Sequence, residues 1–332
     1  MAHKLLPDIK LPTLMHAEKP NIQSHSVPVN FCRPGSVLIY LPVFICLTTG
    51  AFADSSGNAE RGTASTIPGP DHVVIVIEEN KSFEQIIGNQ AAPYINLLAI
   101  SGALFTQSFG ITHPSQPNYL ALFSGSTHGI KSNECPLQLS GANLASELLK
   151  QGLTFGIYSE SMPAAGYTGC FAESRHYARK HNPAVNWQGN NLPSDVNMTF
   201  NEFPWDYTKL PTVSIVIPNT INDLHDGWNR DDAIKRGDTW LRNNLDAYVQ
   251  WGKTHNSLLL LTWDEDDNSS NNQIPTIFVG PMVIPGRYDH RIDHYSVLRT
   301  LAEMYGLSLP GNTMTVQPIQ NIWVPGKDSD SQ

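Results

Sequence analysis

Short, uninterrupted runs of apolar residues recur along the chain and alternate with segments whose apolar residues have a helical spacing. Such runs, rich in Val, Ile and Leu, are typical of strands buried on both faces in a parallel sheet. The pattern predicts strands at His72–Ile77, Ala103–Thr106, Thr154–Ser159, Val213–Ile217, Ser257–Trp263 and Ile274–Val279.

The segments between these runs predict helices. We expect them over Phe83–Ile100, directly after Ser115, over Asn143–Gln151, from about Gly237 to Trp251, and from Asp293 to Gly306. Alternating strands and helices predict a single-domain α/β/α sandwich with a mostly parallel central sheet. The domain is expected over residues 71–312, followed by a C-terminal tail over 313–332. Within it, the polar, aromatic and Pro/Gly-rich residues 160–210 predict an insertion over the edge of the sheet that acts as a substrate lid.

The first apolar run of the chain, Val37–Leu47, has a different meaning. It follows Arg33, is too short to span a bilayer, and leads to Ala51-Phe52-Ala53, as in a signal peptide with its cleavage site. We therefore predict a leader over residues 1–53, a flexible linker over 54–70, and a mature protein that is secreted or periplasmic. Residue 45 is Ile, which is too large for a lipoprotein processing site, so no stable membrane anchor is expected.

The predicted mature chain keeps two of the four cysteines, Cys135 and Cys170. A single pair of cysteines in an exported chain indicates one disulfide. The alternative, a metal site at these cysteines, would need further Cys or His ligands, and neither neighbourhood offers them.

The formal net charge of −9 and the pI of about 5.7 exclude a basic surface for nucleic acid and a polybasic membrane patch. An acidic protein that binds phosphate needs a local cation in the binding site.

The segment His113–Tyr119 has the composition of a rigid turn before a helix. Pro114 and Pro117 stiffen the backbone on both sides of Ser115, and the helix that follows would direct unpaired N–H groups and a positive dipole end at the Ser115 hydroxyl. This segment alone is compatible with two functions of Ser115: a nucleophile beside a phosphate site, or a simple helix N-cap.

Charged and polar residues follow three of the predicted strands. Glu78-Glu79-Asn80 follow the first strand, Asp223–Asp226 lie beyond the fourth, and Asp264–Asp267 follow the fifth. The carboxyl ends of parallel strands lie at one edge of a sheet, where open α/β proteins bind their ligands. We therefore expect these groups to converge near Ser115 and His294, each at a helix start.

Four ordered motifs together resemble a known family. The motifs are Glu79-Asn80, His113-Pro114-Ser115-x-Pro117-Asn118-Tyr119, Asp264-Glu265 and Asp293-His294-Tyr295-Ser296. They resemble the secreted phosphoesterases that include acid phosphatases and phospholipases C, within the alkaline phosphatase superfamily. The resemblance extends from Asp71 to Leu309 and implies an alkaline-phosphatase-like fold.

The resemblance implies a hydrolase of phosphoric esters with a metal ion beside the nucleophile. The implied ligands are Glu79, Asn80, Asp264 and Glu265, and the implied nucleophile is Ser115, which would form a phosphoseryl intermediate. Oxygen ligands favour Ca²⁺, Mg²⁺ or Mn²⁺, whereas added His ligands would favour Zn²⁺.

The remaining site residues are also implied by the resemblance. Asn118 and backbone N–H groups of the elbow would hold the phosphoryl oxygens. His225 and His294 match positions that bind a second metal in two-metal relatives, and here they would bind phosphate or protonate the leaving oxygen. Either Asp223 or Asp226 would orient them or join a metal. The expected substrate-binding residues are His113, His128 and Asp226.

Three functions remain open at this point. The first is a phosphomonoesterase of acid-phosphatase type that acts on phosphoinositides or other small phosphorylated molecules; the form of the elbow and the compact mature length favour it. The second is a phosphodiesterase or phospholipase C that acts on phospholipid headgroups. The third is a non-catalytic phosphate- or glycan-binding protein, which would be expected to have lost the nucleophile or a metal carboxylate.

Overall fold

A nine-stranded sheet runs through residues 67–172, 175–227 and 229–325, the parts of the chain that the computed structural model describes. The predicted leader and most of the predicted linker lie outside these residues. The strands are β1 (His72–Glu78), β2 (Ala103–Phe109), β3 (Phe155–Ser159), β4 (Asn197–Thr199), β5 (Val213–Ile217), β6 (Ser257–Trp263), β7 (Gln273–Val279), β8 (Gly286–Tyr288) and β9 (Ile292–Asp293). Their order is β4-β3-β5-β1-β6-β7-β2-β8, and β9 pairs with β2.

All six predicted strands are confirmed, and every strand pair is parallel except the two that involve β7. Strand β7 follows β6 through the loop over 264–272, which contains no helix, so the two strands can pair antiparallel without a crossover. Strand β2 pairs with the other side of β7 and therefore runs in the same direction as β1, β5 and β6. The carboxyl ends of these four strands thus lie at the same edge of the sheet.

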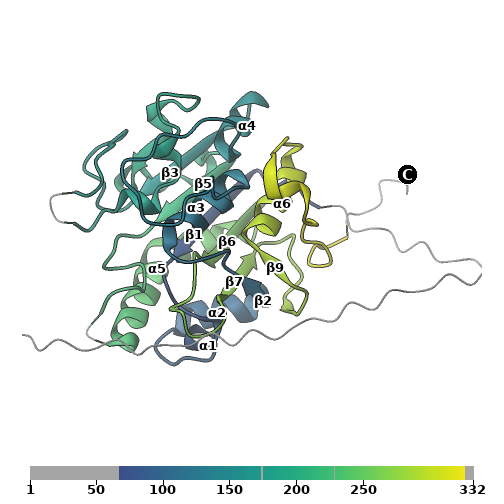
Figure 1. Ribbon diagram of the computed structural model, residues 1–332. Coiled ribbons are helices and arrows are strands. Elements are labelled where there is room, and N and C mark those ends of the chain that lie inside the picture. Colours follow the sequence, from purple (N-terminus) through teal and green to yellow (C-terminus); the bar gives the residue numbers. More distant parts are fainter. Residues whose placement is uncertain (1–66, 173–174, 228, 326–332) are drawn as a thin grey trace, which may run out of the picture. The chain divides into compact units, whose positions relative to one another are not determined.

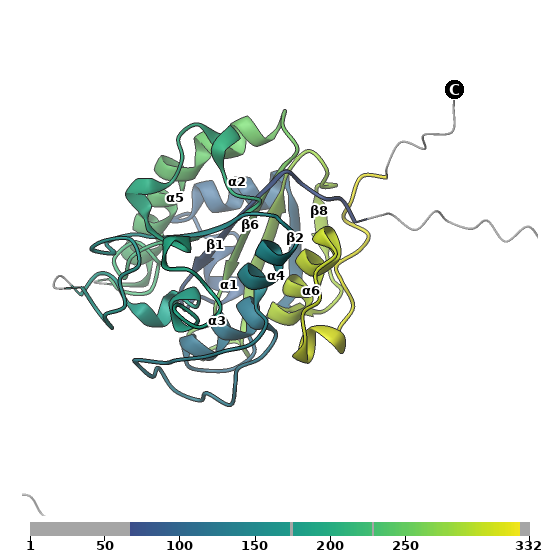
Figure 2. The same ribbon diagram turned by 90° about the horizontal axis from the view of Figure 1, so that it is seen from above.

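Helices cover both faces of the sheet (Figures 1 and 2). They are α1 (Phe83–Ile86), α2 (Pro93–Ser101), α3 (Ser115–Ser124), α4 (Leu144–Lys150), α5 (Arg230–Gly252) and α6 (His294–Tyr305). The side chains of β1 alternate between two hydrophobic cores: Val73, Ile75 and Ile77 pack with α3, α4 and α6, whereas Val74 and Val76 pack with α1, α2 and α5. The predicted α/β/α sandwich is therefore confirmed.

Two predicted helices differ in extent from the observed ones. The expected helix over Phe83–Ile100 is divided into α1 and α2, because the chain turns at Gly88, with φ of +87°, and α2 starts anew at Pro93. Helix α5 begins seven residues before Gly237, since the Asn229 side chain accepts a hydrogen bond from the N–H of Asp232 and caps an earlier start.

The segment over 160–210 contains five short 3₁₀ helices and strand β4, which extends the sheet beside β3. The part of the expected tail that the structure describes, residues 313–325, packs on the domain: its Ile319, Ile322 and Trp323 are buried. None of the helices in the described ranges is long and apolar enough to cross a membrane.

Candidate active site

The register between β1 and β6 brings the carboxylates together. Glu78 lies opposite Trp263, so Glu79-Asn80 and Asp264-Glu265 leave the sheet side by side. Beyond the strands, the N–H of Asp264 donates to the carbonyl oxygen of Glu78 at 3.0 Å. Strand β5 lies on the other side of β1, and beyond it the carbonyl oxygen of Asp223 accepts from the N–H of Glu79 at 2.8 Å.

Strand β2 and the turn after it place Ser115 at the same edge of the sheet. After the strand, a Cβ at Gly110 would lie 2.8 Å from the Asp264 carbonyl oxygen, so only glycine allows this close passage. The Asn118 Oδ1 then accepts hydrogen bonds from the N–H groups of Ile111 and Thr112 at 2.8 and 3.1 Å and closes the elbow. Ser115 is the first residue of α3 and the N-cap position is Pro114, so the N-cap role for Ser115 is excluded.

The Ser115 hydroxyl is surrounded by charged groups. Its Oγ lies 3.1 Å from Glu79 Oε2 and 3.2 Å from Glu265 Oε1, and it accepts a hydrogen bond from Lys180 Nζ at 3.2 Å. Because a hydroxyl has one proton, it donates to one carboxylate at a time. Either carboxylate can therefore accept the proton that Ser115 must lose to become a nucleophile.

The second oxygen of Glu79 is held by two aromatic side chains. Tyr119 donates to Glu79 Oε1 at 2.6 Å, and His181 Nε2 lies 3.0 Å from the same oxygen. The two rings stack with centroids 5.3 Å apart. Together they fix the orientation of Glu79, so that its Oε2 faces Ser115.

The carboxyl groups of the site differ in acidity. Burial, reinforced by the charges of Glu79 and Glu265, raises the pKa of Asp264 well above its ordinary value. Burial and the charge of Glu79 have the same effect on the pKa of Asp223. Burial also raises the pKa of Glu265, although the nearby His113 opposes the shift. These three groups therefore resist ionisation together.

Glu79 is the exception. Its burial opposes ionisation, but the charges of His181 and Lys180 and the hydrogen bonds from His181 and Tyr119 outweigh burial and lower the pKa of Glu79. The site therefore holds one firmly ionised carboxylate next to Ser115, surrounded by carboxyl groups that are costly to ionise.

The four predicted metal ligands lie together, and their unpaired oxygens suit a hard cation. Asn80 Oδ1, Asp264 Oδ2 and Asp223 Oδ2 are buried without a hydrogen-bond partner, which is unfavourable unless something else binds them. Asn80 also contacts both predicted ligands on β6, through its N–H to Asp264 Oδ1 at 3.3 Å and its Nδ2 to Glu265 Oε1 at 3.1 Å. As they stand, no three His, Cys, Asp or Glu side chains of the described ranges are arranged as a complete metal site. The donor types are those that Ca²⁺, Mg²⁺ or Mn²⁺ prefers.

His113 lies within the cluster. Its side chain is 30% exposed, with Nδ1 2.9 Å from Glu265 Oε2 and Nε2 3.2 Å from Asp266 Oδ1. Both ring nitrogens thus face carboxylates of the loop after β6, and the ring remains partly exposed.

His225 and Asp226 lie at the border of the site. The N–H of His225 donates to Asp223 Oδ1 at 3.0 Å, while its ring is 43% exposed and contacts Asp226 Oδ1 at 2.5 Å. The carboxylate can therefore orient the imidazole ring. Of the two alternatives, Asp223 accepts from the backbone N–H of His225, and Asp226 contacts its ring.

Three other expected site residues make structural contacts. Asn118 uses its Nδ2 on the carbonyl oxygen of Thr112 at 2.8 Å and on Glu265 Oε2 at 3.3 Å, so its amide braces the elbow. His294 is buried and donates to the Asp264 carbonyl oxygen at 2.6 Å, which fixes the loop after β6. His128 bonds Ser124 at the far end of α3, about 14 Å along the helix from Ser115, and the structure does not bring it to the cluster.

Sequence analysis missed Lys180 and His181. They belong to the segment over 160–210, whose lack of apolar periodicity gave no sign of its path. The one available signal was indirect: the acidic composition implied that a phosphate site would need a nearby cation, and Lys180 provides one.

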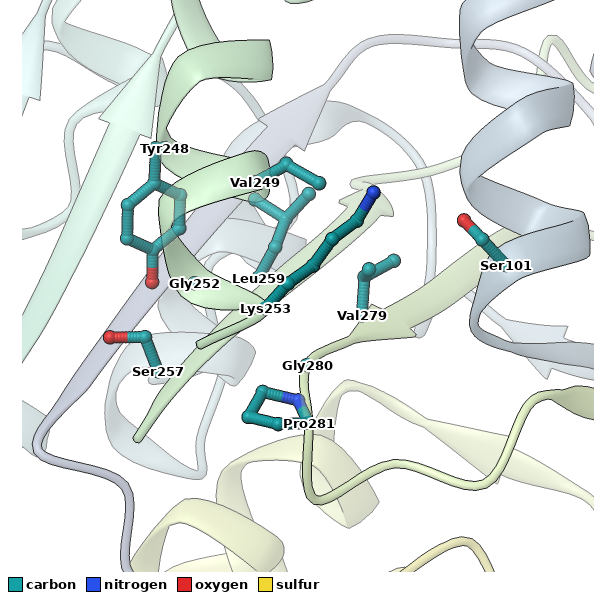
Figure 3. Close-up of a pocket in the computed structure, with 10 residues that line it drawn as sticks. All are labelled: Ser101, Tyr248, Val249, Gly252, Lys253, Ser257, Leu259, Val279, Gly280 and Pro281. Carbon is teal, nitrogen blue, oxygen red and sulfur yellow. The ribbon is translucent and has the colours of Figure 1, made fainter. Parts of the chain in front are cut away.

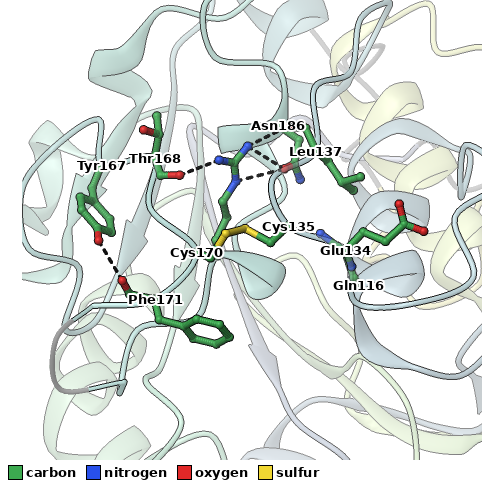
Figure 4. The surroundings of a disulfide bond; sticks show 10 residues. Gln116, Glu134, Cys135, Leu137, Tyr167, Thr168, Cys170, Phe171 and Asn186 are labelled. Atoms are coloured by element: carbon green, nitrogen blue, oxygen red, sulfur yellow. Dashed lines mark hydrogen bonds between the residues drawn. A yellow bond between two sulfur atoms is a disulfide. The ribbon is translucent and has the colours of Figure 1, made fainter.

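A disulfide anchors the segment that carries these two residues. Cys135 and Cys170 are bonded, as predicted (Figure 4). Cys135 follows Glu134, whose N–H donates to the side chain of Gln116 at 2.6 Å, so one side of the disulfide is connected to the first turn of α3. The other side is Cys170, whose carbonyl oxygen accepts from the N–H of Arg179 at 3.0 Å. The disulfide thus connects the Lys180 segment to the helix that starts at Ser115.

A small apolar pocket of about 450 Å³ lies at the other edge of the sheet (Figure 3). Its lining includes Ser257 at the start of β6 and Val279 at the end of β7. The length of β6, about 20 Å, therefore separates this pocket from Asp264, which follows the other end of the strand. Two recesses lined in part by charged side chains border the candidate site instead. One of about 1070 Å³ includes Ser82, Arg230 and Asp267, and one of about 1100 Å³ includes Arg175, Asp226 and Arg236.

Comparison with known proteins identifies related sequences. The model of the phosphoesterase family matches residues 89–308. A phosphatidylinositol-3-phosphatase from Mycobacterium tuberculosis is 52% identical over 264 residues, which cover 78% of this chain and 85% of that protein. An acid phosphatase from Aspergillus fumigatus (30% identical) and a phosphate-repressible acid phosphatase from Penicillium chrysogenum (31%) match 69% and 71% of this chain. The matches cover only 53% and 59% of these two fungal proteins.

Solved structures resemble the fold at low sequence identity. A protein of the alkaline phosphatase superfamily from Vibrio parahaemolyticus has a TM-score of 0.53 at 15% identity, over 77% of this chain and 72% of that one. A phosphonate monoester hydrolase from Agrobacterium radiobacter has a TM-score of 0.50 at 16% identity, over 72% and 74% of the two chains. The arrangement of the sheet and helices is therefore that of the alkaline phosphatase superfamily.

Proposed function

Because the chain belongs to the phosphoesterase family and is a hydrolase of phosphoester bonds, we propose that it is a metal-dependent phosphomonoesterase of acid-phosphatase type with Ser115 as its covalent nucleophile. The observation that carries this proposal is the position of Ser115 Oγ, which lies between the carboxylates of Glu79 and Glu265 and within 3.2 Å of the Lys180 ammonium.

In the first step, Ser115 Oγ attacks the phosphorus of the substrate. The hydroxyl proton passes to Glu79 or Glu265, the bond between Oγ and phosphorus forms, and the bond between phosphorus and the leaving oxygen breaks. The leaving oxygen takes a proton from a general acid, and His225, paired with Asp226 at the border of the site, is suited to that role. The products of this step are the free alcohol and a phosphoseryl group on Ser115.

In the second step, water attacks the phosphoseryl group. The water oxygen bonds to phosphorus and gives a proton to His225, which lost one in the first step, while the bond between Oγ and phosphorus breaks. Inorganic phosphate leaves, and Oγ regains its proton from the carboxylate that accepted it. Tyr119 and His181 keep Glu79 in place through both steps, and His294 holds the loop that carries Asp264 and Glu265.

Glu79, Asn80, Asp264 and Glu265 would hold the divalent cation. When bound, such an ion favours the alkoxide form of serine and neutralises charge on the phosphoryl oxygens. The buried, unpartnered oxygens of Asn80 and Asp264 support this assignment.

Small phosphorylated molecules are the proposed substrates, including phosphoinositides. The Mycobacterium tuberculosis relative named as a phosphatidylinositol-3-phosphatase supports this choice. The two recesses beside the site, each of about 1100 Å³ and lined in part by charged side chains, offer space for a hydroxyl-rich leaving group.

The test is to trap the intermediate. Wild-type protein is mixed with ³²P-labelled p-nitrophenyl phosphate and quenched in acid, in which a phosphoseryl ester is stable, and the labelled peptide is identified. We expect label on the peptide with Ser115, and Ser115→Ala should lose both the label and at least about 10³-fold in kcat. Thr112→Val is the matched control and should keep most of the rate. Label on another residue, or a substantial rate for Ser115→Ala, would replace Ser115 as nucleophile. Faster hydrolysis of bis-p-nitrophenyl phosphate than of the monoester would identify a phosphodiesterase instead.

A further inference from the structure

The Lys180 side chain contacts the reacting oxygen. Its Nζ lies 3.2 Å from Ser115 Oγ, while its distance to the nearest carboxylate oxygen, Glu79 Oε2, is 3.9 Å. Its side chain is 24% exposed, although the Ser115 residue is only 2% exposed. Lys180 thus reaches the buried hydroxyl while remaining partly open to solvent, from which a substrate arrives.

We propose that Lys180 is a catalytic residue that stabilises negative charge on Ser115 Oγ and binds the phosphoryl group that Oγ receives. This inference rests on the proposed function of Ser115, and it assigns the role of the local cation to a residue of the segment over 160–210.

The position of Lys180 is fixed by its neighbours in the chain. The preceding Arg179 is buried, and its guanidinium donates to the carbonyl oxygens of Thr168 and Leu137 at 2.6 Å each and to Asn186 Oδ1 at 3.3 Å. The following His181 is buried against Tyr119 and Glu79. Lys180 therefore projects from a backbone held on both sides, as a preorganised electrostatic group requires.

The contacts of Lys180 favour a role in the reaction of Ser115 over a role that only neutralises the charge of Glu79. Glu79 already has Tyr119 and His181 on its other oxygen, and its separation of 3.9 Å from Lys180 is long for a charge-assisted hydrogen bond. The closer partner of Lys180 is a neutral hydroxyl, which gains little from an ammonium until it loses its proton. The contact therefore strengthens as the alkoxide forms.

The same contact serves both steps of the reaction. During attack, the Ser115 proton leaves to a carboxylate, and Lys180 keeps its own three protons while it stabilises the alkoxide. Once phosphorus is bonded to Oγ, the phosphoryl oxygens lie around the position where Nζ now touches Oγ, so the ammonium can donate to them. When water attacks the phosphoryl group, Oγ becomes the leaving oxygen, and Lys180 again stabilises its charge.

The experiment uses two readouts. In a Ser115→Ala background, which cannot turn over, the affinity for inorganic phosphate is measured by calorimetry with Lys180, Lys180→Met and Lys180→Arg. The loss of a charge-assisted contact in Lys180→Met should weaken phosphate binding about tenfold to a hundredfold. Lys180→Arg keeps the charge and should lose less. The matched control is Lys209→Met, a mostly exposed lysine of the same segment that pairs with Asp206 at 3.1 Å, and it should change nothing.

The second readout is turnover with Ser115 present. Lys180→Met should lower kcat for p-nitrophenyl phosphate about 10²- to 10³-fold, the usual effect of removing one preorganised donor to developing charge. If thermal melting shows that Lys180→Met does not fold, Lys180→Gln takes its place with the same expectations.

The outcomes separate this proposal from the proposed function. If phosphate affinity is unchanged and kcat stays within threefold in a folded Lys180 variant, Lys180 only offsets the charge of Glu79 and the proposal is overturned, even if Ser115 is labelled. If the wild-type protein hydrolyses no phosphate ester but its phosphate affinity still depends on Lys180, the proposed function fails while the anion-binding role of Lys180 is supported.

Discussion

Replacing Asp264 by Asn should make the metal-free protein more stable and remove its response to divalent cations. The Asp264 carboxyl group is buried beside Glu79 and Glu265, and its Oδ2 has no hydrogen-bond partner. Asn has nearly the same shape, keeps an oxygen that can accept from the N–H of Asn80, and carries no charge. The substitution therefore removes electrostatic repulsion without opening a cavity.

The magnitude follows from the spacing of the carboxylates. Glu79 Oε2 and Glu265 Oε1 lie 3.1 and 3.2 Å from the same Ser115 Oγ, so they are at most about 6.3 Å apart. Two unit charges at that distance repel by about 2.6 kcal/mol at an effective dielectric constant of about 20. Asp264 adds a third carboxyl group to this cluster, and its raised pKa is partly due to the same two neighbours. Taking one such pair as the scale for the repulsion that Asp264 adds, the neutral Asn should gain about 2–3 kcal/mol, or roughly 5–10 °C in Tm for a domain of this size.

The assay is thermal melting at pH 7.5 in chelator and with added Ca²⁺, Mg²⁺, Mn²⁺ or Zn²⁺, together with measurement of bound metal. Wild-type protein should melt lower in chelator and recover with the bound ion. Asp264→Asn should melt higher than wild type in chelator, show no rise with any ion and hold no metal. The control Asp289→Asn, at an exposed position, should shift Tm by no more than about 2 °C. A wild-type Tm that does not respond to chelator, combined with an Asp264→Asn protein that melts lower than wild type, would refute the reasoning.

Three further predictions use the same domain. In chelator, Tm should fall as the pH rises from 5 to 8. The pKa values of Asp223, Asp264 and Glu265 are raised in the folded protein, so the fold loses stability as these groups ionise. The pKa of Glu79 is lowered, so its protonation costs stability only at more acidic pH. A flat or rising Tm over this range would contradict those shifts. Replacing both cysteines of the disulfide by Ser should lower kcat more than it raises KM in assays with p-nitrophenyl phosphate, because the bond anchors the Lys180 segment; unchanged kcat would mean that Arg179 alone suffices. Protein recovered from culture medium should begin near Asp54 by mass spectrometry, and active protein with residues 1–53 intact would refute export by signal cleavage.

Sequence pattern was sufficient to predict the sheet and the edge of the sheet that carries the candidate site. Continuous runs of β-branched residues such as Val73–Ile77 are typical of strands buried between two helical layers, and parallel strands place their carboxyl ends together. The convergence of Glu79, Asp264 and Ser115 follows from that rule, and the family suggested by the four motifs is confirmed. The antiparallel direction of β7 could not be predicted from the sequence, because an apolar run has the same composition whether its strand is parallel or antiparallel.

The part of the site that sequence could not predict comes from a segment without periodicity. The path of residues 160–210 depends on particular long-range contacts: the disulfide at Cys170, the bonds of Arg179 to the carbonyl oxygens of Thr168 and Leu137, and the stacking of His181 on Tyr119. None of these leaves a repeating pattern of apolar residues, so a pattern-based reading treats the segment as a lid. Composition still constrained the answer, since an acidic protein with four clustered carboxyl groups needs a cation to approach phosphate. The proposed metal ligands follow buried strands, so the sequence pattern reveals them. Lys180 comes from an irregular segment, so only the three-dimensional structure shows that its positive charge lies beside Ser115.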